Sequence, residues 1–121
     1  FERPEISSLK KDNIALLGDA AHPMVPFMGQ GGCIAIEDSY CFGLIFSKIR
    51  DKEKALKIYQ TIRLKRGNWI QRRSKIQALY NHMSNSTLVK IRNFISRRLF
   101  RKAVSRLHAF DIHKETLFKI S

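Results

Sequence analysis

Cysteine is scarce in this chain, and long apolar runs are missing. Only two cysteines occur, Cys33 and Cys41, and their spacing fits neither a metal site nor a disulfide framework. We therefore predict two reduced packing residues in a cytoplasmic protein. No stretch of about 18 apolar residues appears, so no membrane-spanning helix is expected. The start at residues 1–4 is polar and lacks both a signal peptide and an initial methionine, so we expect a trimmed or incomplete chain.

Acidic residues are missing from a long part of the chain. The formal net charge is +13, and from Arg63 onward no Asp or Glu occurs until Asp111. Such basic regions bind nucleic acid, lipid surfaces or acidic substrates, but more often they form solvated faces. We favour a solvated face or a homodimer contact, and weak contact of residues 92–106 with a membrane surface is the alternative. No nucleic-acid partner is expected, because no zinc-finger, RRM or helix-turn-helix signature occurs.

The chain has 121 residues, of which 44% are hydrophobic. This is enough for the core of one modest domain. Residues 13–17 form a short apolar run that ends in Gly18 and Asp19, which is typical of a buried strand in a parallel sheet. The segment at residues 20–32 holds two prolines and three glycines. This composition predicts a loop with special backbone geometry.

Apolar residues then recur at helical spacing. They predict a buried helix of about 17 residues that begins near Gly32 and ends near residue 50. A long helix over residues 52–82 follows, either continuous or broken near Gly67, with Asp51 as its N-cap. A third helix is expected to start at a cap formed by Ser86 and Thr87. No element is predicted for residues 111–121.

The segment with the clearest chemistry is residues 18–38, which reads GDAAHPMVPFMGQGGCIAIED. Asp19 stands at the carboxyl end of the predicted strand, where ligands of open parallel sheets bind. Its carboxylate accepts hydrogen bonds from sugar-like hydroxyls. The glycines allow backbone amides to lie against a flat ring, and the following helix directs its positive end toward it. These features predict a site for a planar group that becomes anionic, although a phosphate fits the same physics.

In its order and composition, GDAAHPMVPFMGQGG followed by AIED resembles the second flavin-binding motif of the class A flavoprotein monooxygenases. Salicylate and hydroxybenzoate hydroxylases, zeaxanthin epoxidase and kynurenine 3-monooxygenase are similar along this stretch. The spacing of Tyr59, Arg63 and Arg66 also resembles the family's next helix, so that the specific match covers residues 1–74.

The resemblance implies an α/β fold, the C-terminal piece of an FAD/NAD(P)-binding (hydroxybenzoate-hydroxylase-like) fold. One parallel-sheet strand would be followed by mostly α-helices. Residues 1–84 would form the C-terminal part of the FAD-binding domain, and residues 85–121 a basic helical extension.

The resemblance also implies FAD-binding roles for named residues. Asp19 would bind the ribityl chain after a close turn at Gly18. Pro26 would lie beside the reactive edge of the isoalloxazine, and the amides of Gly31 and Gly32 would contact its pyrimidine end. The complete predicted set is Gly18, Asp19, Pro26, Gly29, Gln30, Gly31 and Gly32. No catalytic side chain and no metal ligand are assigned.

Other residues near the loop receive simpler roles. Glu37 and Asp38, on the helix, would be structural partners. His22 is predicted to pack in the loop rather than to act as a general base. Three side chains near the loop either line a substrate pocket or fill space in the core, and the sequence favours neither interpretation: Met24, Phe27 and Met28.

The activity implied by the resemblance is reduction of FAD by NAD(P)H, reaction with O2, and transfer of one oxygen atom to a small aromatic acid. A membrane-associated isoprenoid epoxidase of the same family and a non-enzymatic basic helical binding module are the alternatives. The family's N-terminal GxGxxG loop does not occur in this chain. We therefore expect the chain to be inactive alone and to need that dinucleotide-binding half as a partner.

Overall fold

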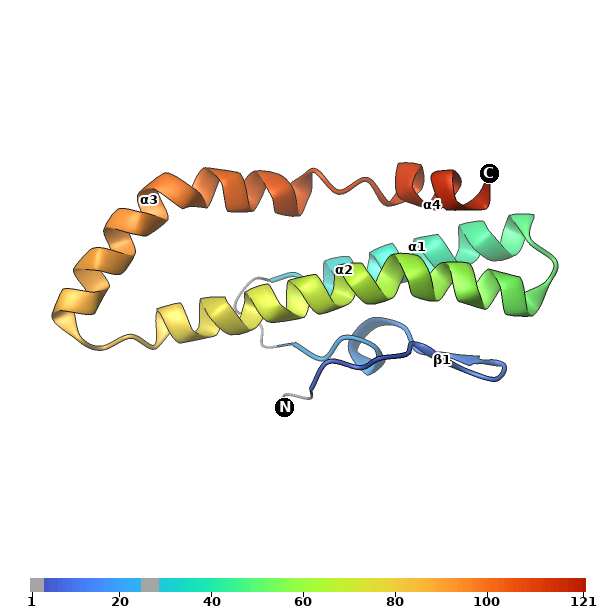
Figure 1. Cartoon of the computed structure of the whole chain (residues 1–121), viewed down its shortest axis with the longest axis horizontal. Coiled ribbons are helices and arrows are strands. Elements are labelled where there is room, and N and C mark those ends of the chain that lie inside the picture. Colours follow the sequence, from blue (N-terminus) through green and yellow to red (C-terminus); the bar gives the residue numbers. More distant parts are fainter. Residues whose placement is uncertain (1–3, 25–28) are drawn as a thin grey trace.

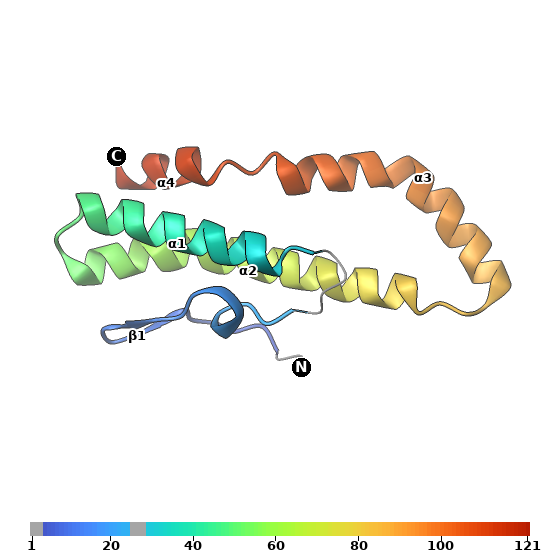
Figure 2. The same ribbon diagram turned by 180° about the vertical axis from the view of Figure 1, so that it is seen from behind.

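The computed structural model describes residues 4–24 and 29–121 of the chain. Figure 1 shows a helical hairpin of α1 and α2 in the middle, the N-terminal segment along one side of it, and α3 and α4 along the other. The reverse view in Figure 2 shows the same three layers. The elements are β1 (Lys10–Lys11), β2 (Ile14–Ala15), the 3-10 helix η1 (Gly18–Ala20), α1 (Gly31–Lys48), α2 (Lys52–Asn81), α3 (Ser86–His108) and α4 (Ile112–Ile120).

The predicted strand exists, but its pairing was predicted wrongly. β2 covers only Ile14–Ala15 and pairs antiparallel with β1, with Lys11 opposite Ile14. The turn between them starts at Asp12, whose φ of 50° is typical of primed hairpin turns. A two-residue turn is enough to join antiparallel strands, whereas parallel strands need a connection of about a dozen residues or more. Within the described residues, the sheet consists of these two strands alone.

The two central helices confirm the periodicity argument. α1 begins one residue before the predicted Gly32 and ends at Lys48. The side chain of Asp51 accepts hydrogen bonds from the amides of Glu53 and Lys54, as an N-cap does. α2 then runs unbroken for 30 residues, through Gly67. It is therefore one helix and not two.

The C-terminal helices depart from the prediction at their starts. Asn85, not Ser86 or Thr87, caps α3, and its side chain accepts from the amides of Thr87 and Leu88. The predicted cap therefore lies one residue too late. α4 was not predicted, although Asp111 is a good N-cap whose side chain accepts from the amide of Lys114.

Only one side of α1 is buried, which corrects the prediction of a helix buried all round. Its buried residues follow one line at helical spacing: Ile34, Asp38, Cys41 and Ile45. Ile36 is 72% exposed, and Cys33 is exposed, so Cys33 is not a core residue whereas Cys41 is. The buried line packs on α2 and α4, and the opposite side has no cover within the described residues.

The core lies between the hairpin helices and the N-terminal segment. Its buried members are Leu9, Ala21, Cys41, Ile45, Ala55, Tyr59 and Ile62. A second cluster joins Ile34 of α1, Ile70 of α2 and Leu107 of α3, which anchors the end of α3 to the hairpin. Over the described residues, no helix is both long and apolar enough to cross a bilayer.

Candidate functional site

The site begins at the end of the N-terminal hairpin, where the chain turns sharply under α1. Gly18 is buried with a φ of +57°, and a Cβ at this position would lie 3.3 Å from the Cβ of Ala35. Both facts favour glycine here. The amide of Gly18 donates a 2.8 Å hydrogen bond to Oδ2 of Asp38. The next residue, Asp19, is exposed. The turn therefore buries Gly18 and presents the Asp19 carboxylate outward.

A hollow of about 320 Å³ lies between this turn and the start of α1. Its lining residues are Asp19, Met24, Gly29, Gly31 and Gly32. Asp19 lies in η1 and not at a strand end as predicted, because β2 already ends at Ala15. A Cβ on Gly31 would lie 3.8 Å from Oδ1 of Asp19, so this carboxylate and the first turn of α1 face each other. The first amides of a helix have no intrahelical acceptor and carry the positive end of its dipole. The hollow thus combines a hydroxyl acceptor with amide donors.

The predicted glycines differ in what they do. Gly29 has a φ of +60°, a conformation that side chains rarely adopt, although a Cβ there would meet nothing within 4 Å. Gly32 also has open space around it, because it lines the hollow. Gln30 takes the N-cap position of α1 without a capping bond from its side chain. Small residues therefore leave room at the start of α1, where a bound group would contact backbone.

A buried ionic network holds the turn and both central helices together. Nε of Arg63 donates to Oδ1 of Asp38 at 2.6 Å, and both side chains are fully buried. Glu37 lies 2.9 Å from Nη1 of Arg63 and 3.0 Å from Nη2 of Arg66. Buried charges require partners, and here two carboxylates meet two guanidinium groups. This confirms that Glu37 and Asp38 are structural partners, and it explains the spacing of the arginines on α2.

Tyr59 ties the end of the hairpin to α2. Its hydroxyl donates to the carbonyl of Leu16 at 2.9 Å, and its ring packs edge-on against Phe42 with centroids 5.5 Å apart. Burial raises the pKa of Tyr59 well above its usual range, so the phenol stays protonated and acts as a donor. Tyr59 therefore positions Leu16, two residues before the glycine turn.

His22 packs beneath the loop, as predicted. Its side chain is 1% exposed, and Nε2 lies 3.6 Å from Oδ2 of Asp38. A Cβ on Gly67 of α2 would overlap the imidazole ring, so the ring lies directly on the helix backbone. His22 is not among the residues that line the hollow, and this placement gives it no access to a group bound there.

The predicted residues thus fall into three groups. Asp19, Gly29, Gly31 and Gly32 meet around one hollow, with Met24 beside them. Gly18 and Gln30 shape its two edges. Pro26, Phe27 and Met28 lie outside the described residues. Asp38 and Arg63 form an ion pair but do not line the hollow, so a search for ligand-facing residues overlooks them. The spacing of Arg63 and Arg66 on α2 is the sequence feature that points to this pair.

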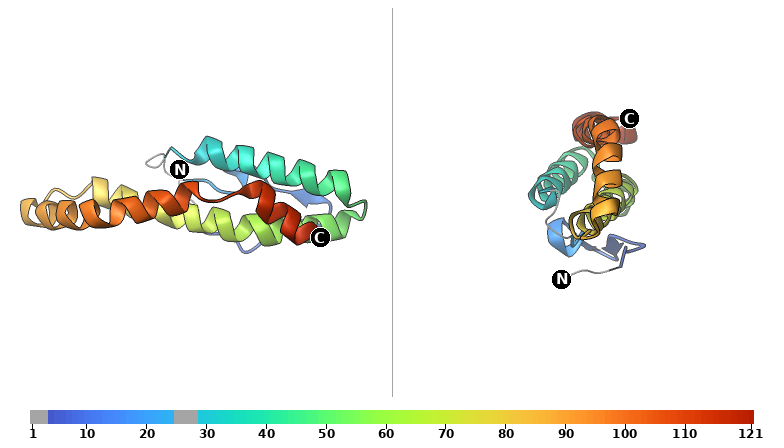
Figure 3. Two further views of the ribbon diagram at one scale, coloured as in Figure 1. Left: turned by 90° about the horizontal axis from the view of Figure 1, so that it is seen from above. Right: turned by 90° about the vertical axis from the view of Figure 1, so that its left-hand side faces the viewer.

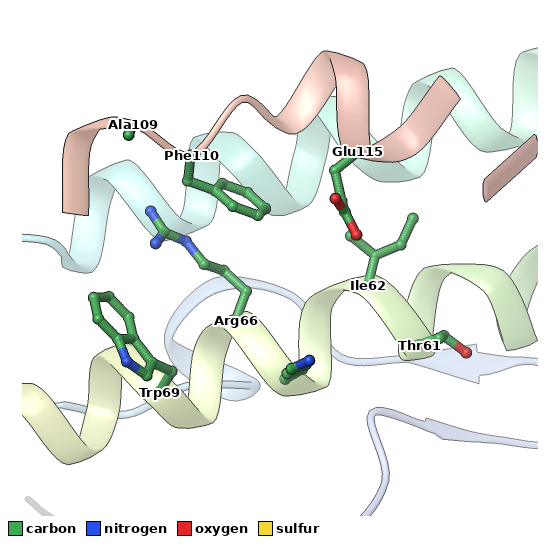
Figure 4. A pocket seen from close by; sticks show the side chains of 8 residues that line it. Thr61, Ile62, Arg66, Trp69, Ala109, Phe110 and Glu115 are labelled. Atoms are coloured by element: carbon green, nitrogen blue, oxygen red, sulfur yellow. The ribbon is translucent and has the colours of Figure 1, made fainter. Parts of the chain in front are cut away.

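A second cavity lies between α2 and the C-terminal segment, and no pattern in the sequence predicted it. Its volume is about 430 Å³, and it is lined by Thr61, Ile62, Lys65, Arg66, Trp69, Ala109, Phe110 and Glu115. Figure 4 shows these side chains between α2 and the connection from α3 to α4. The guanidinium carbon of Arg66 lies 4.2 Å from the Phe110 ring centroid and 5.6 Å from that of Trp69. Residues from distant segments form this cavity, so only docking of the C-terminal helices creates it.

Comparison with known proteins decides which group the first hollow suits. The model of the FAD binding domain family matches residues 4–74, more than half of the chain. The chain belongs to this family. It is the domain of the class A FAD-dependent monooxygenases, which confirms the resemblance drawn from residues 18–38. The family fits an FAD/NAD(P)-binding fold. The lining of the hollow is compatible with such a group, because an exposed carboxylate and the first amides of α1 face each other across it.

Several curated proteins are similar to the chain over the same stretch. It is 42% identical over 72 residues to the FAD-dependent monooxygenase phomE of Diaporthe leptostromiformis, covering 57% of the chain and 20% of that relative. It is 45% identical over 60 residues to the FAD-dependent urate hydroxylase of Klebsiella pneumoniae, covering 50% of the chain and 16% of the relative. The chloroplastic zeaxanthin epoxidase of Capsicum annuum is 50% identical over 48 residues, which cover 40% of the chain and 7% of that relative.

The chain therefore spans about a fifth or less of the length of the curated relatives it matches. No solved structure matches it.

Proposed function

We propose that this chain is the FAD-holding part of an NAD(P)H-dependent flavoprotein monooxygenase that hydroxylates a small aromatic acid with O2. The observation that carries the proposal is the hollow at the start of α1, where Asp19 faces Gly31. Relatives named as FAD-dependent monooxygenases support the reaction type. The aromatic acid rests on the resemblance of residues 18–38 to salicylate and hydroxybenzoate hydroxylases.

Each residue of the hollow would have a defined task. FAD, when bound, supplies the redox chemistry with NAD(P)H and O2. Asp19 would accept hydrogen bonds from ribityl hydroxyls. The amides of Gly31 and Gly32, together with the dipole of α1, would stabilise negative charge at the pyrimidine end of the ring. Asp38 and Arg63 would hold the glycine turn in place without contacting the cofactor.

The partner in this proposal is the N-terminal dinucleotide-binding half of the family. The 121 residues contain no GxGxxG loop, so the contacts of that loop with FAD would come from this partner half. We accordingly propose that the chain alone is inactive. The two free cysteines agree with a cytoplasmic location.

A second candidate is a membrane-associated isoprenoid epoxidase. Two observations favour it: the similarity to zeaxanthin epoxidase over 48 residues, and the exposed apolar face of α3 described below. Both candidates share the FAD site and differ in the substrate, so oxygen incorporation into each class of substrate separates them.

The test is performed on the protein at the length found in its source cells. We expect it to bind FAD, to oxidise NAD(P)H faster when a small aromatic acid is present, and to incorporate 18O from 18O2 into that acid. Asp19→Asn should weaken FAD binding about tenfold or more, because a charged acceptor in a hydrogen bond contributes about 1.5–3 kcal/mol.

Asp12→Asn is the matched control, because Asp12 is exposed at the hairpin turn and lies outside the hollow. Equal FAD affinity in the two variants would contradict the role of Asp19. Absence of flavin binding together with retained RNA binding would overturn the enzyme proposal in favour of a binding module.

A further inference from the structure

The first half of α3 exposes a stripe of large apolar side chains. Leu88, Ile91, Phe94 and Ile95 are between 40% and 64% exposed. Their spacing of three and four residues places them along one face of the helix. Ile76 and Leu79 near the end of α2, and Met83 in the connection to α3, are also exposed. In Figures 1 and 3 these two segments form the end of the molecule that extends beyond α1.

The same helix carries positive charge and no negative charge. Lys90 and Arg97 are exposed beside the apolar stripe, and α3 contains no Asp or Glu. Arg92, on the side toward α2, donates from Nη1 to the carbonyl of Tyr80 at 2.7 Å. At 3.6 residues per turn, the apolar stripe therefore lies between cations on both of its edges.

Contacts at both ends hold α3 in this position. The bond from Arg92 to Tyr80 connects its first half to the end of α2. At the other end, Leu107 packs with Ile34 and Ile70, and its carbonyl accepts from Nη2 of Arg66 at 3.1 Å. The exposed stripe therefore belongs to an anchored helix.

We propose that this face of α3, formed by Leu88, Ile91, Phe94 and Ile95 with Lys90 and Arg97, binds the surface of an anionic lipid bilayer. A helix with an apolar stripe edged by Lys and Arg lies in the plane of a membrane interface, with its apolar side chains among the acyl chains and its cations at lipid phosphates. A solvated face does not need four large exposed apolar residues. Nucleic acid would pair with the cations and could stack a base on Phe94, but it would leave the aliphatic side chains of Leu88, Ile91 and Ile95 exposed. This proposal is independent of the flavin chemistry.

Vesicle flotation of the protein at its native length tests the proposal. The vesicles are phosphatidylcholine alone, or phosphatidylcholine mixed with phosphatidylserine, at low and at physiological ionic strength. We expect flotation with the mixed vesicles, weakened by salt because surface charges are screened. Phe94→Ser should reduce partitioning about tenfold, since it removes one inserting ring.

Phe118→Ser is the matched control, because Phe118 is 75% exposed on α4 and lies outside this face. Circular dichroism of both variants should match the wild type, since both side chains are already exposed. Equal loss in the two variants, or no flotation of the wild type with anionic vesicles, would overturn the proposal. Binding of RNA without flotation would also overturn it. The same holds for a dimer, detected by sedimentation, that the Phe94→Ser substitution dissociates.

Discussion

Asp38 is the residue at which three parts of the chain meet. Its carboxylate accepts from the amide of Gly18 and from Nε of Arg63, and it lies near the ring of His22. Because the group is fully buried, each of these partners offsets part of its desolvation. A residue outside the lining of the hollow thus holds the turn before Asp19 in place.

Replacement of Asp38 tests this role. Asp38→Ala should lower the free energy of unfolding by about 3–5 kcal/mol, because it leaves the buried guanidinium of Arg63 without its closest partner. Urea denaturation measures the change. Glu53→Ala is the control, since its pair with Lys57 is exposed and contributes little. A loss in Asp38→Ala no larger than in Glu53→Ala would show that the network is not stabilising.

Two glycines of the central helices should respond in opposite directions to alanine. Gly67→Ala should destabilise by about 1–3 kcal/mol, because its Cβ overlaps the ring of His22. Gly43→Ala should stabilise by about 0.5–1 kcal/mol, because a Cβ there meets nothing within 4 Å and alanine is the better helix former. Thermal unfolding of the two variants measures both shifts. A Gly67→Ala variant as stable as the wild type or more stable would refute the packing of His22 on Gly67.

At the scale of elements, capping residues separate the helices. Asp51, Asn85 and Asp111 each accept hydrogen bonds from amides of the helix that follows. The Asp51 cap follows directly from the sequence, because a polar residue precedes a clear apolar period. Asn85 lies among several polar residues that are all good caps, so only the backbone conformation decides between them.

The N-cap residue of α4, Asp111, should make the stability of this helix depend on pH in the acidic range. The amide of Lys114 lowers the pKa of the Asp111 carboxyl below its usual value of 3.8. A carboxyl whose pKa is lower in the folded state contributes stability above its unfolded pKa, and that contribution disappears as the pH falls through the folded value. We therefore expect the protection factors of the α4 amides, which correct for the intrinsic pH dependence of exchange, to be lower below about pH 4 than at neutral pH.

Hydrogen exchange across the acidic range measures this change, and Asp111→Asn is the control. Asparagine still caps a helix but does not titrate in this range. The part of the acid response that comes from protonation of Asp111 should therefore disappear in this variant. An identical acid response in both proteins would assign the effect to other carboxylates.

At the scale of the whole molecule, the C-terminal helices return to the hairpin that holds the site. Figure 2 shows α4 lying along α1, and the Tyr40 hydroxyl lies 2.7 Å from Nδ1 of His113. Thr116 of α4 is fully buried and donates to Sγ of Cys41 at 3.5 Å. The family match ends at Ser74, but packing continues well past it. A domain boundary near residue 84 stays a prediction, and it falls between α2 and α3.

The charge distribution also acts at this scale. The acidic residues of the middle region, Glu37 and Asp38, neutralise Arg63 and Arg66 inside the fold. α3 contains no acidic residue, and its first half, which holds the exposed Lys90 and Arg97, forms the end of the molecule that extends beyond α1 (Figure 3). This separation of the ion pairs inside the fold from the exposed cations of α3 underlies the proposed contact with anionic lipid.

Local patterns in the sequence were enough to predict α1, α2, the cap at Asp51 and the position of the glycine-rich loop. These features depend on residues close together in the chain: a helical period, a capping side chain, and glycines where side chains do not fit. The family followed from the same segment, because residues 18–38 combine a strand end, a loop and a helix start in one continuous run. The approach of Asp19 to Gly31 is the consequence of that local order.

The three-dimensional packing was needed to show which side of α1 is buried and where α3 and α4 lie. Cys33 and Cys41 look alike in an apolar helix, yet one is exposed and the other is covered by Thr116, a residue 75 positions away. The same holds for Asp38 and Arg63, and for the cavity beside Arg66. These contacts join segments far apart in sequence, and their free energy depends on which surfaces meet, a property that no local pattern of residues contains.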